Sequence, residues 1–364
     1  MSLTATVITD LAGLASLQPA WQALSKRLEG SLDFFASYDW THAYLTHYQP
    51  PDWFVVAIFD KASGQLRAVF PLQRFLLNDE AQQFSACKAL ALPYLPYTDF
   101  LVESYDRRVL VNFLLNDVLR LHLKIDLIFF WPLHEDSKLY LTLIEDLGGS
   151  PALKTERYPN NLHHIDGRSQ CLADYVGSRP KHVFKKKNNY LRRLAAKGSI
   201  SLGSHTDLLT LEATVKQLCD WNQTKFEGQH AYARFADWPD FLTQLTRKLL
   251  PLGRAELTTL RLDGQLIGAM LCFIHKKRRC FFMGDYDPRF KAESPSKILL
   301  SHLIEKTFSE GGVFCMGAGS NAYKRDWTQS VGEIKSAIVF LNPDARAVLE
   351  PHLTKAGISR ITGF

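Results

Sequence analysis

The chain has 364 residues, 46% of them hydrophobic and 12% aromatic, with a formal net charge of +6 at pH 7. This length exceeds that of a typical domain with a single hydrophobic core. We therefore expect two domains or one duplicated unit, with a sizeable buried interior. The mild basic excess suits an anionic small molecule or a nucleotide carrier as partner, and it does not call for DNA.

Cysteine usage and the N-terminus indicate the cellular compartment. The six cysteines stand at positions 87, 171, 219, 272, 280 and 315, with no CxxC spacing, which favours reduced thiols and no structural metal. The opening "MSLTATVITDLAGLASL" has no basic n-region, and no apolar run is long enough for a membrane span. We therefore expect a cytoplasmic protein without a transmembrane segment.

The first half of the chain predicts a sheet with one helix. From Trp53, "WFVVAIFDKASGQLRAVFPLQRF" predicts strand, turn and strand, and "ACKALALPYLPYTDFLVE" predicts another extended segment. "DRRVLVNFLLNDVLRLHL" predicts a helix and "IDLIFFWPL" a short buried strand. The order is β-β-β-α-β.

A strongly basic segment, "SRPKHVFKKKNNYLRRLAAKGS" (178–199), follows and contains no acidic residue. Its apolar residues fall on one side at helical spacing, so the helix can pack and still present cations, among them Lys186, Arg192 and Arg193. Because no Glu compensates at i±4, we favour phosphate or substrate binding by these three side chains. The alternative is a solvated helix face.

The second half repeats the order of the first. After two further helical patterns, "LTTLRLDGQLIGAMLCFIHKKRRCFFMGDYD" predicts three strands joined by turns, followed by a helix and the strand "VFCMG". "SGQLRAVF" (63–70) and "DGQLIGAM" (263–270) match in their turn and apolar strand. We therefore predict an internal duplication, with one α/β domain at residues 1–165 and a second at 166–364.

The predicted helix of the second half begins at "SPSK". Ser294 suits an N-cap, Pro295 suits the first helical position, and Gly311 ends the apolar periodicity. Lys297 falls in the first turn, where free amides already make the site positive, so an anion such as phosphate could lie opposite Ser294, Ser296 and Lys297. A lysine that only points into solvent explains this residue equally well.

Several blocks together resemble one superfamily. The order hairpin, strand ending in "GDYDP", helix entered through "SPSK" and then "VFCMGAGSNAYKRDW" resembles the GNAT acyltransferases, in particular the CelD-like branch related to the FemAB peptidoglycan aminoacyltransferases. "FFASYDWTHAYLTHY", "PYTDF" and "FKKKNNYLRR" are similar to other blocks of that branch. The resemblance spans nearly the whole chain, although "FKAESPSKI" replaces the glycine-rich loop of single-domain members.

The resemblance implies tandem GNAT-like domains, each an α/β (α+β) fold with a mixed central sheet flanked by helices. It also implies that the strands on either side of the Ser-Pro helix splay apart and hold an acyl donor, acyl-CoA or acetyl-CoA. Asp285, Tyr286 and the Ser-Pro-Ser-Lys residues would then form one wall, and residues 315–319, with Gly317 and Gly319, the other.

Acyl transfer to an amine needs a proton acceptor and a group that stabilises the leaving atom. For the first role we select Asp99, because burial between Tyr97 and Phe100 would raise its pKa; a turn aspartate that caps its own backbone is the commoner alternative. For the second we select Tyr286, which could equally be an edge-strand tyrosine. If the Tyr286 side chain faces the donor site between the splayed strands, the side chain of the neighbouring Asp285 points to the opposite face of the strand.

The resemblance implies that Tyr97, Lys324 and Trp327 position the acceptor. For Lys324 and Trp327 the alternative is that the segment "YKRDW" only closes the end of the sheet. We interpret His163, His164 and Asp166 as structural, since adjacent strand residues point in opposite directions.

Three functions remain open: an N-acyltransferase that uses an acyl-CoA-type donor on an amino-sugar, amino acid or peptide amine; a tRNA-dependent aminoacyl ligase of FemAB type; and a non-catalytic accessory protein that binds a glycan or a partner. The setting for each is bacterial envelope or exopolysaccharide assembly. The first is our main prediction, with a small-molecule donor and an amine acceptor.

Overall fold

The computed structural model describes residues 2–28, 34–78, 82–90, 98–225, 238–319, 322–328 and 330–356. The chain forms two compact units: unit 1 comprises Met1–Asn161 with Gly332–Phe364, and unit 2 comprises Leu162–Val331. The C-terminal segment from residue 332 to 356 therefore belongs to unit 1, whereas the sequence division grouped it with the second domain. It returns because strand β13 pairs with β6 of unit 1, from Ile334 with His134 to Phe340 with Leu127.

Unit 1 contains a mixed sheet in the order β1-β2-β3-β4-β6-β13-β7, with β5 paired to β3. β4 and β6 are parallel, and β1 to β4 are successively antiparallel. Its elements are β1 (Leu3–Ile8), α1 (Leu11–Arg27), α2 (Tyr38–Tyr48), β2 (Trp53–Asp60), β3 (Leu66–Asn78), β4 (Gln83–Ala89), β5 (Leu101–Val102), α3 (Arg107–Asn112), η1 (Phe113–His122), β6 (Leu127–His134), α4 (Lys138–Leu147), the start of β7 (Leu153–Asp166), β13 (Ser330–Phe340) and α11 (Pro343–Ala356).

Helices cover both faces of this sheet. On one face α1 packs Trp21 against strand residues that include Val55 and Val69. On the other, η1 and α4 pack against the alternate residues of the same strands, such as Val56 and Phe70. This two-sided burial explains why the strands read as nearly continuous apolar runs.

Unit 2 contains a sheet in the order β7-β12-β11-β10-β9-β8, in which β7 contributes its last residues. β11 and β12 are parallel, and β8 to β11 are successively antiparallel. Its further elements are α5 (Leu172–Gly177), α6 (Lys181–Ala195), β8 (Ile200–Ser204), α7 (Leu211–Lys225), α8 (Trp238–Leu249), β9 (Ala255–Leu262), β10 (Gln265–His275), β11 (Arg278–Tyr286), η2 (Pro288–Glu293), α9 (Pro295–Ser309), β12 (Val313–Ala318) and α10 (Ala322–Trp327).

Both units thus share one strand order: four antiparallel strands, then a strand parallel to the fourth. The predicted tandem α/β architecture with mixed sheets flanked by helices is confirmed. Each unit has one strand more at its start than the sequence predicted, namely β1 and β8. That the two units arose by duplication stays a prediction.

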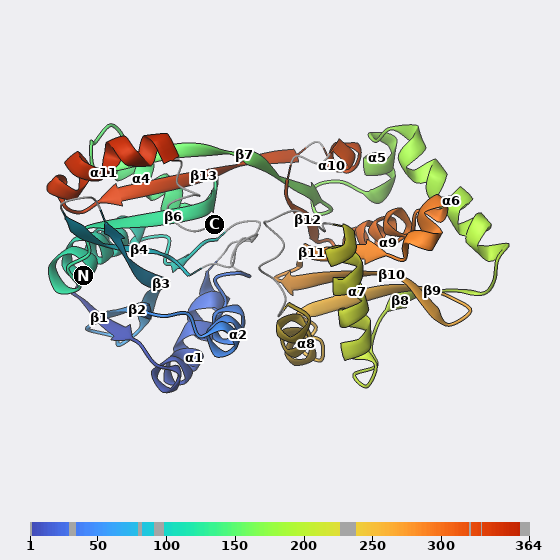
Figure 1. The fold of residues 1–364 in the computed structure, drawn as a ribbon, viewed down its shortest axis with the longest axis horizontal. Helices are drawn as coiled ribbons and strands as arrows, with labels where there is room; N and C mark the ends of the chain where they lie inside the picture. The colour runs from blue at the N-terminus through green and yellow to red at the C-terminus, as the bar shows by residue number, and fades with distance from the viewer. Residues whose placement is uncertain are drawn as a thin grey trace. The chain divides into compact units, whose positions relative to one another are not determined.

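In unit 2, helix α9 covers one face of the sheet and α7 with α8 covers the other (Figure 1). On the α9 side, Leu299 and Leu303 share a core cluster with Met270 and Cys272 of β10. On the α7 side, the sulfur atoms of Cys219 and Met283 lie 4.0 Å apart. In the described part of the chain, no helix is long and apolar enough to cross a membrane.

Candidate functional site

The two parallel strands of unit 2 pair over only three residues. Their ladder runs from Arg278 with Val313 to Cys280 with Cys315, although β11 continues to Tyr286 and β12 to Ala318. Beyond the last pair, the facing edges of the two strands share no ladder hydrogen bond among the described residues. Backbone groups on the inner edge of β11 after Cys280 are therefore not used by β12, whereas at the end of β12 the carbonyls of Gly317 and Ala318 accept from Lys324.

The last residues of β11 point to opposite faces of the sheet. Asp285 pairs with Ala269 and Tyr286 pairs with Gly268, so their side chains alternate, as predicted. Tyr286 is half-buried on the α9 side, where a Cβ atom on Gly268 would lie 3.1 Å from Leu299 and 3.4 Å from the Tyr286 Cβ. Burial, and secondarily Asp285, raise the pKa of Tyr286, which keeps its proton on the phenol.

Asp285 is a buried carboxylate that faces helix α7. Its Oδ2 accepts from Lys225 Nζ at 3.2 Å and lies 3.4 Å from Asn222 Nδ2. Burial raises the pKa of Asp285, and the charge of Lys225 offsets only part of this effect. From the sequence, Asp285 was expected on the wall of the site without a chemical role, because strand alternation does not show which face is functional.

The turn before α9 has an unusual backbone. Ser294 adopts the left-handed conformation (φ 48°, ψ 58°), which few residues other than glycine adopt, and it separates η2 from α9. It occupies the predicted N-cap position, but its side chain makes no capping hydrogen bond. A left-handed residue here supplies the local bend that a glycine-rich loop would provide.

This turn offers fewer amides than the sequence suggested. The Lys297 N–H donates to the Ser294 carbonyl at 3.0 Å, so it is already used. No described residue accepts from the Ser296 N–H, and the Lys297 side chain is exposed. One free amide and one ammonium group therefore remain for an anion.

A buried carboxylate lies beside the same turn. Glu293 is 4% exposed, and its Oε1 lies 2.7 Å from Lys197 Nζ, which follows helix α6. The lysine compensates the negative charge that would otherwise repel an anion at α9.

At the end of β12, a buried cation holds the backbone. Lys324 of α10 is 3% exposed, and its Nζ donates to the carbonyls of Gly317 at 3.3 Å and Ala318 at 2.5 Å. Burial lowers the pKa of Lys324 to about 8. Gly317 (φ 71°) and Gly319 (φ 125°) both lie in the region that favours glycine, so this turn needs them.

His163 of β7 lies beside this turn and is 2% exposed. Its ring hydrogen-bonds to the backbone of Gly319, and burial, reinforced by Lys324, lowers its pKa. His163 and Lys324 together therefore bind three consecutive residues, 317–319. This agrees with the interpretation of His163 as structural, yet it places the histidine directly behind the candidate site.

Trp327, predicted to position the acceptor, lies in the core instead. Its ring is buried at a centroid distance of 5.5 Å from Phe184, and its carbonyl accepts from the Tyr175 hydroxyl at 2.5 Å. The alternative, that this residue closes the sheet, fits the packing.

Comparison with known proteins identifies this arrangement. Residues 181–325 match the model of the acetyltransferase (GNAT) domain, a span that includes β11, α9, β12 and Lys324. The protein has a GNAT-superfamily fold. Residues 181–325 are called the GNAT domain below, after the model that they match.

Solved structures extend the likeness to nearly the whole chain. FemX has a TM-score of 0.62 at 12% identity over 96% of this chain and 100% of its own. The C-terminal domain of a protein described as a lysylphosphatidylglycerol synthetase from Agrobacterium fabrum has a TM-score of 0.56 at 13% identity, covering 96% and 98%. L-PGS from Bacillus licheniformis has a TM-score of 0.52 at 11% identity, covering 94% and 96%. The fold is therefore similar to that of FemX over nearly its whole length. No curated protein sequence matches the chain.

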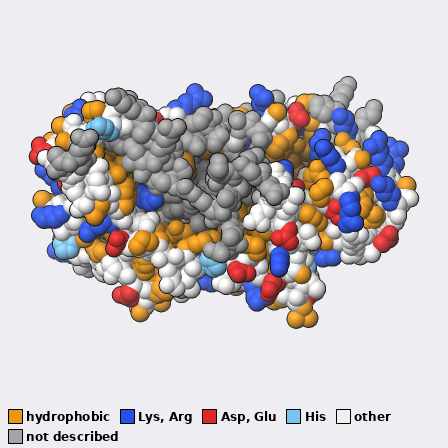
Figure 2. All heavy atoms as spheres, viewed as in Figure 1, with side chains coloured by type: hydrophobic (Ala, Val, Ile, Leu, Met, Phe, Trp, Pro, Cys, Tyr) orange, Lys and Arg blue, Asp and Glu red, His pale blue; other side chains and the backbone are white. Residues whose placement is uncertain are grey.

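Helix α6 opens the GNAT domain, and its predicted cations lie at the surface. Lys186, Arg192 and Arg193 are exposed, and Figure 2 shows basic side chains gathered over the region of α6. Lys187 instead lies 2.6 Å from Glu305, which fastens α6 to α9. The helix therefore packs through one face and presents cations on another, as expected.

The remaining candidates lie outside the GNAT domain. Asp99 belongs to unit 1, where its Oδ1 accepts from the Phe100 N–H at 2.8 Å and from Ser137 Oγ at 3.0 Å. This is the local capping that we gave as the alternative. Tyr97 lies outside the described residues.

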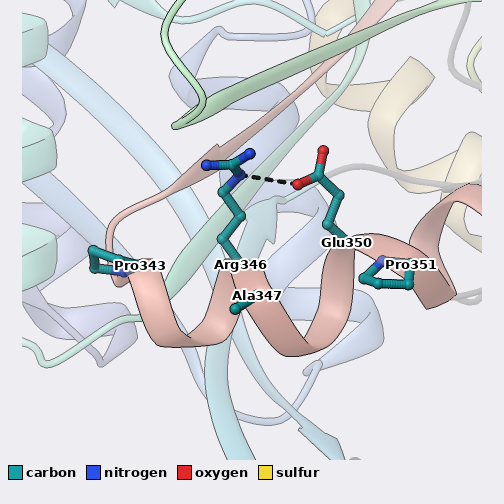
Figure 3. Close-up of a pocket in the computed structure, with 5 residues that line it drawn as sticks. All are labelled: Pro343, Arg346, Ala347, Glu350 and Pro351. Atoms are coloured by element: carbon teal, nitrogen blue, oxygen red, sulfur yellow. Dashed lines mark hydrogen bonds and ion pairs between the residues drawn. The ribbon is translucent and has the colours of Figure 1, made fainter.

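One surface pocket of unit 1 lies on a single helix. Pro343, Arg346, Ala347, Glu350 and Pro351 of α11 line it, and Figure 3 shows Arg346 paired with Glu350, at 2.9 Å. None of the predicted site residues lines this pocket. Among the described residues, no group of three or more His, Cys, Asp or Glu side chains could hold a metal ion.

Proposed function

We propose that this protein is an N-acyltransferase that moves an acyl group from an acyl-CoA-type donor to the amine of an amino-sugar, amino acid or peptide. The observation that carries the proposal is the divergence of β11 and β12 within the GNAT domain. It leaves unpaired backbone groups beside a buried carboxylate and a buried lysine.

The donor would lie between the diverging strands, with its phosphates near the start of α9. The Ser296 N–H and the Lys297 ammonium group suit an anion there, and Lys197 neutralises the nearby Glu293. Gly317 and Gly319 keep the opposite wall free of side chains, so a ligand can approach the backbone closely. These groups fit a phosphate-bearing carrier, which supplies the acyl group in activated form.

The acceptor amine must lose a proton when it attacks the acyl carbon. Asp285 is the base that fits this step, because its raised pKa increases the carboxylate's affinity for a proton while Lys225 and Asn222 hold it in place. Because the donor would lie between the strands and not on one face of the sheet, Tyr286, whose phenol stays protonated, would donate to the departing group from the α9 side while Asp285 acts from the α7 side. Asp99 stays a second candidate for the base.

Lys324 would act as a fixed positive charge at the end of β12. Its ammonium group, held by the carbonyls of Gly317 and Ala318, would face the acyl oxygen as that oxygen gains negative charge in the transition state. A cation that is already fixed and buried stabilises such a charge more strongly than a solvated one.

A tRNA-dependent aminoacyl ligase of FemAB type is the second candidate. The exposed cations of α6 favour it, because a run of phosphates is bound by neighbouring lysine and arginine side chains. The fold likeness to FemX is compatible with it. We place either activity in envelope or exopolysaccharide biosynthesis, in keeping with the resemblance to the CelD-like branch.

A ligand screen tests the proposal. Thermal shift with acetyl-CoA, longer acyl-CoAs, nucleotide sugars and bulk tRNA identifies the carrier, since a ligand at a hundred times its Kd stabilises the fold by about 2.7 kcal/mol. A shift with an acyl-CoA, followed by release of free CoA thiol in the presence of an amine, is the expected result. A shift with tRNA alone selects the ligase, and none with any carrier selects a non-catalytic accessory protein.

A further inference from the structure

Two cysteines form the last pair of the ladder between β11 and β12. Cys280 and Cys315 are direct partners on these adjacent parallel strands, so their side chains project from the same face of the sheet. They are 1% and 0% exposed, and the Cys280 thiol hydrogen-bonds to the Cys315 sulfur. Backbones of neighbouring strands lie about 4.8 Å apart, within the range that a disulfide bridges.

The surroundings of this pair favour the thiolate form of Cys315. The hydrogen bond from Cys280 lowers the pKa of Cys315 most; Arg278, the Gly317 N–H and Lys324 add to this effect, while burial opposes it. A thiolate is the form of cysteine that reacts with oxidants and disulfides. The other buried cysteines differ, because burial raises the pKa of Cys87, Cys219 and Cys272.

Strand register separates this pair from its nearest neighbour. Cys272 of β10 precedes Phe273, the partner of Cys280, so its side chain projects from the opposite face. It is as buried as Cys315 but has no thiol beside it in the register. Cys272 is therefore a matched control, and Cys171 is the exposed thiol that a reagent meets first.

We propose that Cys280 and Cys315 form a reversible disulfide under peroxide, which makes the end of the β11–β12 ladder an oxidation site. The Cys315 sulfur attacks one peroxide oxygen, the O–O bond breaks, and the departing oxygen takes a proton, which leaves a sulfenic acid. The Cys280 sulfur then attacks the Cys315 sulfur, the S–O bond breaks, and water departs with the Cys280 proton. The two thiols supply the two electrons that reduce the peroxide.

The bond would tie the two strands together beside the space that we propose for the donor. The proposed disulfide does not depend on that function, since only the register and the contact of the two cysteines support it.

Native-state oxidation tests the inference in the Cys171→Ser protein, which lacks the exposed thiol. Hydrogen peroxide should remove two hydrogen atoms from the intact mass, and non-reducing peptide mapping should show Cys280 joined to Cys315. Dithiothreitol should restore both thiols. Cys272→Ser, added to the same background, should form the link to the same extent.

Cys280→Ser and Cys315→Ser should each abolish the link, and a circular dichroism spectrum like that of the parent shows that they fold. With Cys280→Ser, Cys315 should stop at the sulfenic acid, which dimedone traps. The inference is overturned if folded Cys171→Ser protein keeps both thiols under peroxide, or if the link forms only in denaturant together with oxidation of Cys272.

Discussion

The Nζ atom of Lys324 lies 2.5 Å from the carbonyl oxygen of Ala318, so a buried cation fastens helix α10 to the end of strand β12. The Gly317 carbonyl accepts from the same nitrogen, at 3.3 Å. Burial lowers the pKa of Lys324 to about 8. Its ammonium group therefore loses its charge at a lower pH than an ordinary lysine does. The end of β12 therefore carries a charge that titrates near neutral pH.

The first prediction follows from this titration. If transfer needs the Lys324 cation, kcat/KM should fall as pH rises through about 8, and Lys324→Met should lower kcat/KM by ~10²-fold and remove that alkaline limb. Arg325→Met changes the exposed neighbouring cation and should keep the wild-type pH profile. An unchanged profile in Lys324→Met would assign Lys324 to structure alone.

A second prediction concerns the base. Asp285→Asn should lower kcat by ~10²–10⁴-fold while the donor still binds, because a general base acts mainly in the transition state. Since burial disfavours the Asp285 charge, the variant should not unfold at a lower temperature near pH 7. Steady-state kinetics and thermal melts measure both.

Asp287→Asn is the matched control, two residues further along. Asp287 caps the start of η2, a position that asparagine caps equally well, and pairs with the exposed Arg289, so the substitution should change stability little and leave kcat within a few-fold. Asp99→Asn run in parallel decides between the two bases. A large kcat loss in Asp99→Asn alone would reject Asp285 as the base.

The third prediction concerns the donor phosphates. Lys297→Ala should raise the donor KM with less effect on kcat, because phosphate anchoring contributes equally to ground and transition states. Lys216→Ala removes an exposed lysine of α7 and should change neither constant. If Lys297→Ala keeps the donor KM and gains stability, the lysine was only a surface residue at the wrong end of the helix dipole.

The fourth prediction separates the two carriers. Lys186→Glu or Arg192→Glu should weaken binding of tRNA and flatten its salt dependence, because fewer counterions are released. The fold should stay intact, since both side chains are exposed. Fluorescence anisotropy with labelled tRNA and with a labelled CoA, across a salt series, measures the effect. If variant and wild type bind both ligands with equal affinity, the cations of α6 form only a solvated helix face and bind neither carrier.

The fifth prediction concerns a buried ion network that holds α9 to the sheet. Glu256 of β9 lies 2.8 Å from Arg279 Nε and 2.6 Å from Lys306 Nζ. Glu256→Gln should cost about 3–5 kcal/mol at pH 7, because it leaves buried cations without their partner. Glu212→Gln, in an exposed pair with Arg247, should cost under about 1 kcal/mol.

The pH dependence of this network has a definite sign. Burial alone would raise the pKa of Glu256, but Arg279 and Lys306 outweigh it and hold the pKa below its usual value. The stabilisation is therefore present above the unfolded-state pKa and is lost as pH falls through the folded-state pKa. Urea unfolding from pH 7 downward should show a steeper acid loss in wild type than in Glu256→Gln; parallel curves would contradict the assignment.

Local signals predicted much of the second half correctly. The Asp263–Gly264 turn was read from its residue types, and both residues indeed have positive φ. Helix α9 begins at Pro295, as its proline and periodicity indicated, and ends at Ser309, two residues before the predicted stop at Gly311. For the site, such local cues selected Lys297, whereas Tyr286 and Lys324 were selected through the resemblance to the GNAT superfamily.

What the sequence by itself determined, therefore, is the order of most strands and helices, without β1 and β8, and the positions of several turns, because neighbouring residues decide these through periodicity, capping and backbone conformation. Only the tertiary structure decided that Asp285 faces Lys225 and that Cys280 lies against Cys315. It also decided that β13 returns to unit 1 and that Trp327 is buried. These contacts join residues far apart in the chain, and their register depends on which apolar faces pack together, which no short window of sequence contains.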